Sequence, residues 1–225
     1  MKFSVMTLFP DLIRSICSES IIGRACDAGY IAIEAHDIRS YSKDKHRRVD
    51  DTPYGGGMGM LMAAPPVYDC YSDVKARLKG TVRTIYMSPQ GSLLTQKKVK
   101  ELRQYDNLLI LCGHYEGIDA RVIEEICDEE ISIGNYVLTG GELPACILID
   151  AVARTCDGVL SDAECYENES VSCGMLEYPQ YTRPYEFHGK KVPDVLLGGN
   201  HKEIQKWREK EALRLTLEKR PDLIT

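Results

Sequence analysis

The sequence predicts an α/β domain with a largely parallel sheet, followed by a small, mainly helical domain. Apolar runs typical of buried strands alternate with segments of helical spacing through the first two thirds of the chain, and this alternation is the pattern of a parallel sheet with crossover helices. The composition then changes, because residues 157–174 are polar and acidic and contain no basic residue. We therefore expect an α/β domain over residues 1–156, a linker over residues 157–174 and a small helical domain over residues 175–225.

The expected elements follow one another regularly. A strand over residues 3–9 is followed by Pro10 and Asp11, which suit a helix start. A short helix over residues 20–27 ends at a glycine, as helices often do. The strand over residues 82–87 is expected to stop at the Ser-Pro-Gln-Gly sequence that follows it. The other strands are expected at residues 31–35, 107–112 and 130–133, and the other helices at residues 65–78, 95–104, 119–127, 143–154 and about 201–219.

Residues 38–62 have no clear period and predict a long loop, which in a compact domain is usually functional or disordered. Residues 52–59 read Thr-Pro-Tyr-Gly-Gly-Gly-Met-Gly, with four glycines in five positions. Glycine costs about 0.5–1 kcal/mol relative to alanine inside a regular element, so this cluster indicates positive φ or a close approach to a ligand. It is neither a dinucleotide fingerprint, since the third glycine is missing, nor a Walker A loop, since no Gly-Lys-Ser/Thr follows.

The basic run directly before the glycines makes a polyanion the favoured ligand, with a flexible surface loop as the open alternative. Residues 39–48 carry five Lys and Arg residues against Asp44 alone, although the whole chain of 225 residues has a net charge of −6. RNA would therefore bind through local patches. A second basic stretch, residues 202–220, fits a solvated helix face with ion pairs equally well. The residues expected to contact RNA are His46, Arg47, Arg48, Asp50, Gly55, Gly56, Gly57 and Gly59.

Cysteine usage and hydropathy indicate the compartment. The nine cysteines are an odd number without a Cys-x-x-Cys pair, which argues against a disulfide framework and a zinc site and fits a reducing cytoplasm. No apolar run approaches the ~20 residues of a membrane span, and the apolar N-terminal stretch is too short for a signal peptide. We expect a cytoplasmic protein with no membrane contact.

Three expected strand ends are marked by glycine and tyrosine, at residues 86–91, 112–119 and 131–144. In a parallel sheet, ligands bind beyond the carboxyl ends of the strands. One such end is an ordinary turn, but three alike predict a shared pocket in which backbone approaches a ligand with an aromatic part.

Together with other motifs, these stretches carry a family resemblance. The others are residues 4–10, residues 47–62 with the run Val-Asp-Asp-Thr-Pro-Tyr-Gly-Gly-Gly-Met-Gly-Met-Leu-Met, residues 150–154, Tyr181-Thr182-Arg183-Pro184, and residues 199–208. In order and spacing they cover nearly the whole chain, which resembles the bacterial tRNA (guanine-N1)-methyltransferases of the SPOUT class. The resemblance implies a deep trefoil-knotted α/β methyltransferase domain, although chains as a rule do not thread loops. It also implies that the small helical domain at residues 175–225 binds tRNA.

The resemblance also implies the reaction and the partners. The family transfers a methyl group from S-adenosylmethionine to N1 of the guanine immediately 3′ of the anticodon in tRNA, and it works as a homodimer with active sites at the subunit interface. The implied cofactor-binding residues are Tyr86, Met87, Ser88, Pro89, Gly113, Tyr115, Glu116, Gly117, Ile133, Gly134, Tyr136, Leu138, Gly140, Gly141 and Pro144.

The implied catalytic residues are Arg154 and Glu169. Guanine N1 carries a proton near neutral pH, so a carboxylate is needed to remove it, and an arginine stabilises the negative charge that grows on the exocyclic oxygen. Without the resemblance, Arg154 would be read as a solvated cation at a helix C-terminus. The family's base is an aspartate, whereas this chain has Glu169 there, and Cys165 replaces a serine; Glu167 or Glu177 could compensate.

A metal and two other functions stay open. Magnesium has been linked to this reaction class, and Glu116 and the linker carboxylates are oxygen ligands of a suitable type, but their spacing does not demand a metal. The alternative functions are a SPOUT methyltransferase with another RNA target, and a non-catalytic tRNA-binding protein that lost its activity through Glu169.

Overall fold

The computed structural model describes residues 1–161, 170–171 and 174–224. The chain divides into two compact units, Met1–Ser161 and Asp162–Thr225. The expected boundaries at residues 156 and 174 stay a prediction.

The first unit is built on a parallel sheet, which confirms the predicted fold class. Within the described residues its strands are β1 (Lys2–Thr7), β2 (Ala32–Asp37), β5 (Val82–Leu93), β6 (Asn107–Cys112) and β7 (Glu129–Ser132). They lie in the order β2-β1-β6-β5-β7, and every neighbouring pair is parallel. Strands β1, β6 and β5 are therefore central, and their near-continuous apolar sequences suit burial on both faces. The knot that the resemblance implies stays a prediction.

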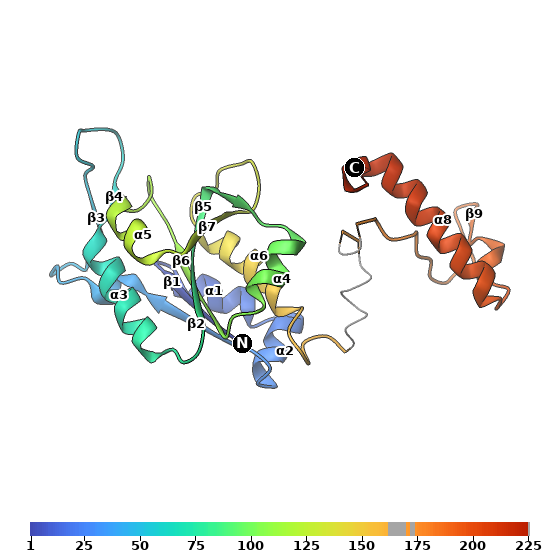
Figure 1. Cartoon of the computed structure of the whole chain (residues 1–225), viewed down its shortest axis with the longest axis horizontal. Helices are drawn as coiled ribbons and strands as arrows, with labels where there is room; N and C mark the ends of the chain where they lie inside the picture. The colour runs from blue at the N-terminus through green and yellow to red at the C-terminus, as the bar shows by residue number, and fades with distance from the viewer. Residues whose placement is uncertain (162–169, 172–173, 225) are drawn as a thin grey trace. The chain divides into compact units, whose positions relative to one another are not determined.

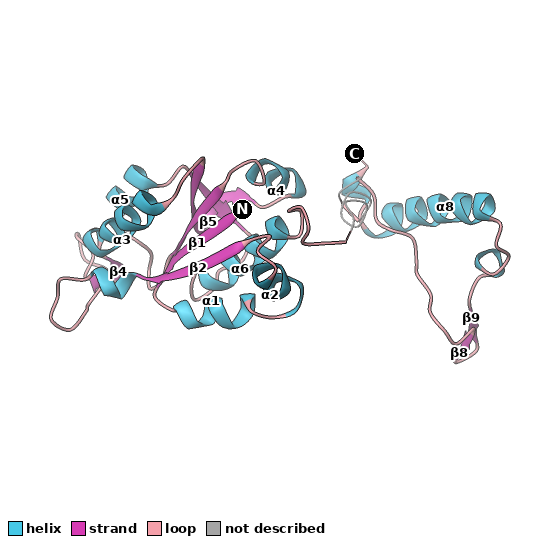
Figure 2. Ribbon diagram, turned by 90° about the horizontal axis from the view of Figure 1, so that it is seen from below, coloured by secondary structure: helices cyan, strands magenta, loops and turns pink. Residues whose placement is uncertain are grey.

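Helices cover both faces of this sheet (Figures 1 and 2). One face packs against α1 (Pro10–Cys17), α2 (Ser20–Asp27), α4 (Gln96–Leu102) and α6 (Glu142–Ala153), and the other against α3 (Ala64–Arg77) and α5 (Ala120–Ile126). Strand β6 shows the division, because Leu108 and Ile110 pack toward the first group while Leu109 and Leu111 pack toward the second. This period of two is the geometry of a strand buried on both sides.

Strand β5 does not stop where the sequence predicted. It was expected to end at Met87, but it continues to Leu93 past an irregularity in its pairing with β7, where Met87 and Ser92 both lie opposite Ile131. Gly91 makes this continuation possible. A Cβ atom there would lie 2.3 Å from the carbonyl carbon of Glu130, so only glycine lets the two strands approach each other so closely.

The long loop predicted over residues 38–62 contains short elements. These are a 3₁₀ turn, η1 (Ile38–Tyr41), and the antiparallel pair β3 (Asp50–Asp51) and β4 (Leu61–Met62). The glycine-rich sequence forms the projecting connection between β3 and β4 (Figure 1). No helix in the described parts of the chain has the length and apolar composition needed to cross a membrane.

The second unit is organised by α8 (His201–Lys219), with the small hairpin of β8 (Glu186–Phe187) and β9 (Lys190–Lys191) and two short 3₁₀ turns, η2 (Asp194–Leu196) and η3 (Pro221–Leu223). The segment before the hairpin packs along α8. Tyr178 and Tyr181 both contact the ring of Trp207, and Arg208 lies over the Tyr178 ring at 4.8 Å. These aromatic contacts form a small core that holds an otherwise irregular segment on the helix.

Candidate active site

A cavity of about 540 Å³ lies where the carboxyl ends of β6 and β7 meet β5 at Tyr86–Gln90, the point at which the pairing of β5 with β6 ends. All three strand-end segments singled out from the sequence contribute to its wall. Every residue expected to bind the cofactor lines it, from Tyr86 to Pro89, from Gly113 to Gly117, and from Ile133 to Pro144. The structure thus brings these residues together, while the roles given to them stay a prediction.

Glycines let two of these segments pack against each other in the wall. The Gly141 amide donates a 2.9 Å hydrogen bond to the carbonyl of Gly113. A Cβ atom at Gly141 would lie 2.8 Å from the Cys112 Cα atom and 3.0 Å from the Gly113 nitrogen. Both are backbone atoms, so no rotamer change can relieve the clash. Glycine is therefore required at position 141 to keep this wall in place.

Buried polar groups at and directly behind the pocket wall include both satisfied and unsatisfied atoms. Glu142, which opens α6, is buried and accepts a 2.7 Å hydrogen bond from Thr7. The Nδ1 atom of His114 is also buried, and the described residues offer it no hydrogen-bond partner. Both side chains lie close to Gly140, where a Cβ atom would be 2.5 Å from Glu142 Oε2 and 2.9 Å from His114 Nδ1. An unsatisfied buried polar atom in a pocket wall suits a ligand that supplies the missing partner.

Tyr86 and Tyr115 differ in their settings. Burial, followed by the nearby carboxylate of Glu130, raises the pKa of Tyr86 to about 12, so its hydroxyl stays protonated and can donate a hydrogen bond. Tyr115 is more exposed and has a positive φ of 60°, a conformation that costs energy for a residue with a side chain. Its ring contacts His114 at 5.0 Å.

Some wall residues were not predicted from the sequence. Gln90, His114, Glu130, Val137 and Thr139 line the cavity, and their signal was available because each lies within or beside a marked strand end. Ile123 and Glu124 also line it, from α5. Their sequence context is that of an ordinary amphipathic helix and gave no signal.

The glycine-rich connection starts at the pocket wall. The Glu116 amide donates to the Met60 carbonyl at 3.0 Å, and the Met62 amide donates to the Gly117 carbonyl at 2.9 Å. These bonds anchor one end of the connection to the segment that lines the cavity. The expected RNA-binding loop and the expected cofactor pocket are therefore neighbours in one unit.

The glycines in this connection have the predicted backbone conformation. Gly55, Gly56, Gly57 and Gly59 all have positive φ, from 79° to 137°. Steric crowding is not the reason for glycine at positions 55 and 56, since a Cβ atom at either position would meet nothing within 4 Å. In the same connection, the Tyr54 and Met58 side chains are 98% and 94% exposed. A loop with this backbone and two open apolar side chains presents a surface to a partner.

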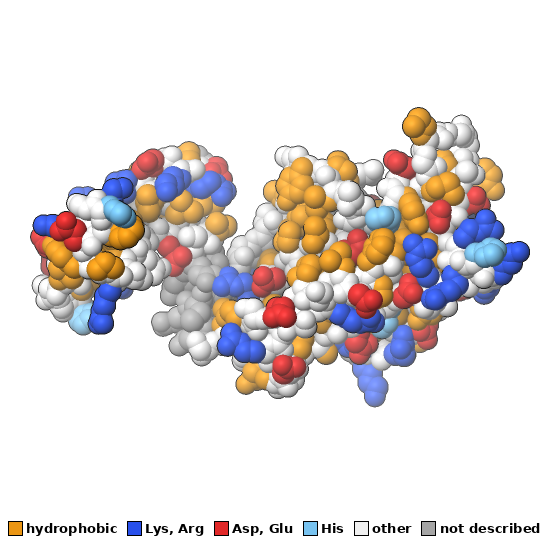
Figure 3. Space-filling model, turned by 180° about the vertical axis from the view of Figure 1, so that it is seen from behind, with side chains coloured by type: hydrophobic (Ala, Val, Ile, Leu, Met, Phe, Trp, Pro, Cys, Tyr) orange, Lys and Arg blue, Asp and Glu red, His pale blue; other side chains and the backbone are white. Residues whose placement is uncertain are grey.

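The basic run that precedes the loop is organised by acidic residues. Arg47 donates to Asp37 at 3.1 Å and to Ser40 at 2.9 Å, and Arg48 pairs with Asp44 at 3.2 Å. The hydrogen bond from Arg48, followed by that from the His46 amide, lowers the pKa of Asp44 to about 2. Figure 3 shows Lys and Arg side chains gathered near the projecting loop. The basic patch is thus held in shape before any partner arrives.

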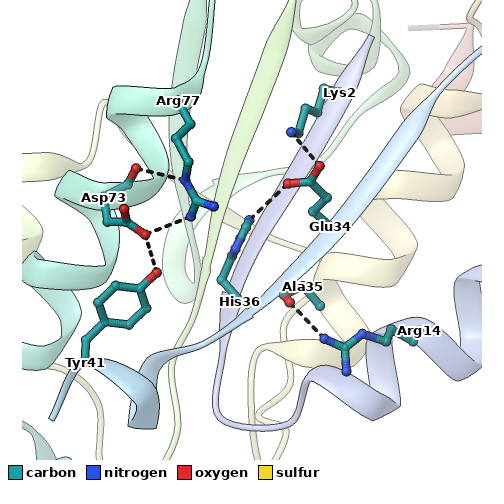
Figure 4. A network of polar contacts seen from close by, with 8 residues as sticks. All are labelled: Lys2, Arg14, Glu34, Ala35, His36, Tyr41, Asp73 and Arg77. Atoms are coloured by element: carbon teal, nitrogen blue, oxygen red, sulfur yellow. Dashed lines mark hydrogen bonds and ion pairs between the residues drawn. The ribbon is translucent and has the colours of Figure 1, made fainter.

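A polar network anchors the start of this run (Figure 4). Tyr41, at the end of η1, donates to Asp73 of α3, which also pairs with Arg77 at 2.8 Å.

On the edge strand β2, Glu34 pairs with Lys2 at 2.7 Å and lies 3.7 Å from His36. The charged side chains along β2 also discourage pairing of this exposed edge with another strand.

Of the two predicted catalytic residues, the structure describes Arg154, which does not line the pocket. Arg154 caps the C-terminal end of α6, where its amide donates to the Asp150 carbonyl at 3.1 Å. Gly141 precedes the same helix, so the rise of 1.5 Å per residue puts the two about 20 Å apart. Glu169 lies outside the described residues, as do Glu167 and Cys165. Glu177 lies in the second unit, where its amide donates to Ser170.

The residues that the structure describes contain no group of three or more His, Cys, Asp or Glu side chains able to hold a metal ion. The participation of Mg²⁺ in the reaction therefore stays a prediction.

The fold and the pocket define an α/β protein with a ligand site at the carboxyl ends of parallel strands. The family model described as tRNA (Guanine-1)-methyltransferase TrmD matches residues 1–225. The chain belongs to this family.

Curated relatives agree over nearly the full length. The tRNA (guanine-N(1)-)-methyltransferase of Ruminiclostridium cellulolyticum is 56% identical over 223 residues, which cover 99% of this chain and 96% of the relative. The proteins of the same name from Lachnospira eligens and Clostridioides difficile are 54% and 48% identical, over 99% of this chain and 94% and 97% of theirs.

Proposed function

We propose that this protein transfers a methyl group from S-adenosylmethionine to N1 of the guanine immediately 3′ of the anticodon in tRNA. The observation that carries the proposal is that the three strand ends form one cavity, in a chain that matches the family model from end to end. The proposed place of action is the cytoplasm, where tRNA is found.

The pocket suits the methyl donor. S-adenosylmethionine supplies a methyl group activated by a sulfonium centre, and it carries an aromatic base, ribose hydroxyls and an amino-acid end. The cavity volume of about 540 Å³ lies in the usual range for ligands of this size. Backbone at Gly113–Gly117 and Ile133–Gly141 offers amide and carbonyl groups to the polar edges of the ligand, while the unsatisfied Nδ1 atom of His114 offers one more polar partner.

The neighbouring loop suits the RNA. The connection that carries Gly55 to Gly59 is anchored to the pocket wall through Met60 and Glu116. A base held by this loop would be close to the bound methyl donor. The basic run before the loop supplies cations for phosphate contacts, which a protein with a net charge of −6 must provide locally.

The chemistry needs one proton acceptor and one cation. As the guanine N1 atom attacks the methyl carbon, the N1–H bond breaks, and the proposed acceptor of this proton is the carboxylate of Glu169. The carbon–sulfur bond breaks at the same time, and its electron pair stays on sulfur. Negative charge that develops on the exocyclic oxygen of the guanine is proposed to be stabilised by Arg154.

A second copy of the chain is part of the proposal. Arg154 is about 20 Å from Gly141 along α6, so one protomer does not place its own arginine beside its own pocket wall through this helix. Helices α1 and α6 pack side by side and share an exposed apolar surface. Its side chains, Phe9, Leu12, Ile16, Leu143 and Ile147, are each between 41% and 49% exposed. A homodimer through this surface would complete each site from both subunits.

Sedimentation analysis of the full chain tests the dimer. The proposal predicts a dimer that Ile147→Asp converts to monomers with intact secondary structure. A parent protein that sediments as a monomer at micromolar concentration would overturn it.

Methyl transfer to unmodified tRNA tests the function. The full chain is incubated with labelled S-adenosylmethionine and a tRNA transcript, and the product is mapped by primer extension, which stops at a base methylated on its pairing edge. We expect one stop, immediately 3′ of the anticodon. A stop elsewhere would identify a methyltransferase with another target, and tRNA binding without transfer would identify a non-catalytic binding protein.

A further inference from the structure

The second unit contains a small cavity of about 190 Å³ between its irregular segment and the β8–β9 hairpin. Its wall includes three aromatic residues, Tyr181, Tyr185 and Phe187, and two lysines, Lys190 and Lys191. Pockets for drug-sized ligands span roughly 300–1,000 Å³, so this cavity suits one ring system rather than a whole cofactor. The family resemblance implied tRNA binding for this unit as a whole, but it singled out none of the residues of this cavity as a contact.

The hairpin that forms one side of the cavity is already shaped. Glu186 pairs with Lys191 and Phe187 with Lys190, and the two turn residues, His188 and Gly189, both have positive φ, of 49° and 77°. Positive φ at both positions is the conformation of a tight two-residue hairpin turn. The ladder is extended by a 3.0 Å hydrogen bond from the Val192 amide to the Tyr185 carbonyl.

Tyr185, which directly precedes the hairpin, is also fixed through its hydroxyl, which donates to Asp194 at 3.3 Å. The hairpin wall is therefore held by bonds within the unit, so a ligand would bind it with little loss of conformational entropy.

Phe187 is exposed although it has a partner in the hairpin. Its side chain is 65% exposed, and its ring meets the His188 ring at 4.2 Å in an edge-on arrangement. A hairpin with two residues in each strand cannot form a core around such a ring. An aromatic face that the fold leaves open, beside a cavity and two amines, is the arrangement by which proteins stack unpaired bases.

The local charge selects the class of ligand. Residues 181–192 carry Arg183, Lys190 and Lys191 against Glu186 alone, a net charge of +2 with His neutral, in a chain whose total is −6. Glu186 is 3.7 Å from Lys191, and Asp194 accepts from Tyr185. With Asp194 included, residues 181–194 still carry three cations against two carboxylates. Aromatic rings beside clustered amines match a base next to its phosphate better than they match an acidic peptide, which would make no use of the rings.

We propose that this cavity, the hairpin pocket, takes an unpaired nucleobase of the RNA substrate. The base stacks on Phe187, and Lys190 and Lys191 contact its flanking phosphate. This inference rests on the proposed function for the identity of the RNA, but it concerns a site that performs no chemistry. The pocket would add affinity and orient the substrate rather than change the methyl-transfer step.

The test uses the full chain and unmodified tRNA, with affinity measured by fluorescence anisotropy at several salt concentrations. Phe187→Ala should weaken binding about tenfold, since one stacked base contributes roughly 1–3 kcal/mol. Phe187→Trp should bind as the parent does, while Phe187→Leu should behave like the alanine variant. Lys190→Gln with Lys191→Gln should lower the salt slope by about 0.7 for each single-strand phosphate that the lysines no longer neutralise.

Matched controls lie in the same unit. Leu197 is another exposed apolar residue, and Lys202 and Lys210 lie on α8. Leu197→Ala and the double change Lys202→Gln with Lys210→Gln should alter affinity less than the hairpin changes. Circular dichroism confirms that each variant is folded, and calorimetry should show unchanged affinity for S-adenosylmethionine.

The outcomes separate this inference from the proposed function. If Phe187→Ala binds tRNA within twofold of the parent, the hairpin pocket is overturned even though the parent methylates tRNA. If the parent transfers no methyl group but Phe187→Ala still weakens RNA binding, the proposed function fails and the hairpin pocket holds. Weaker binding of a polyglutamate peptide with unchanged tRNA affinity would overturn the pocket as an RNA site.

Discussion

The Thr7 hydroxyl donates a 2.7 Å hydrogen bond to the buried carboxylate of Glu142, 135 positions away in the chain. The same hydroxyl accepts a 2.9 Å bond from the Phe9 amide. Thr7 ends β1, and Glu142 opens α6 directly after the Gly140-Gly141 wall of the pocket. Because the carboxylate also sits at a helix N-terminus, its charge is favoured there. This bond therefore ties the pocket wall to the centre of the sheet.

Removing that bond should destabilise the protein. Thr7→Val keeps the shape of the side chain but leaves a buried carboxylate oxygen without its donor, which should cost about 1–3 kcal/mol in the free energy of unfolding. Urea unfolding measures this cost. The matched control is Thr84→Val, because Thr84 is equally buried and its hydroxyl has no partner among the described residues. Equal stability of the two variants would show that the Thr7–Glu142 bond contributes nothing.

An ion cluster at the start of β7 should make stability depend on pH. Burial would raise the pKa of Glu129, but hydrogen bonds from Arg83 at 2.8 Å and Lys98 at 3.0 Å outweigh it and lower the pKa below its ordinary value. The unfolded chain then binds the proton more readily than the folded one. The stabilisation is therefore fully present above the unfolded pKa of about 4.3 and is lost as pH falls through the lower folded pKa.

Glu129→Gln is the variant that reveals this dependence. The parent should be more stable than the variant at neutral pH, and the difference should shrink as pH falls below about 4. Glu125→Gln, at an exposed position of α5, should show a smaller change with pH. A difference between the parent and Glu129→Gln that stays constant from neutral to acid pH would contradict the assignment.

Gly141 tests whether the cavity binds the methyl donor. In Gly141→Val the new side chain would overlap the backbone of Cys112 and Gly113, so the wall must move and affinity for S-adenosylmethionine should fall below detection in calorimetry, even without RNA. Gly198→Val is the control, since a Cβ atom there meets nothing within 4 Å. Unchanged affinity in the folded Gly141 variant would count against this pocket.

Substitutions in the basic run test whether Arg47 and Arg48 contact the phosphates of the RNA. Arg47→Gln with Arg48→Gln should weaken tRNA binding and flatten its salt dependence, because each phosphate that is no longer neutralised removes about 0.9 from the slope in duplex contexts. Arg47→Lys with Arg48→Lys retains the charges and should retain most of the slope, although the planar hydrogen-bonding fork is absent. An identical slope in the glutamine variant would show that these arginines only shape the loop around Asp37 and Asp44.

The proton acceptor is tested by single-turnover methyl transfer. Glu169→Gln keeps the size of the side chain but cannot accept the proton, so the rate should fall about 10²–10⁴-fold with unchanged cofactor affinity. Glu169→Asp restores the side chain of the family and should stay active. A glutamine variant within about threefold of the parent, well below the loss expected for a base, would move the test to Glu167.

The sequence predicted the sheet well because its signals are local. The strands β1 and β6, the start of β5 and the helices between them appear within a few residues of their expected bounds. It failed at Gly91, because the continuation of β5 depends on how closely β7 approaches, a relationship between segments about 40 positions apart.

The candidate site divides in the same way. Glycine and tyrosine at three expected strand ends predicted the cavity. The sequence around Glu124, and around the buried pair of Thr7 and Glu142, contains no motif that indicates a site. The hairpin pocket was also missed, since Tyr181-Thr182-Arg183-Pro184 was noticed only as part of a resemblance. This motif lines a cavity only because the turn at Gly189 places Phe187 opposite Lys190 and both line the cavity with Tyr181.

The most direct measurement is nucleoside analysis of tRNA treated with the protein and S-adenosylmethionine. The transcript is digested and its methylated nucleosides are identified by mass spectrometry. We predict 1-methylguanosine, up to one per tRNA, and none when the guanine 3′ of the anticodon is replaced by adenine or when Gly141→Val is used. A different methylated nucleoside, or 1-methylguanosine that persists in the adenine transcript, would contradict the proposed reaction.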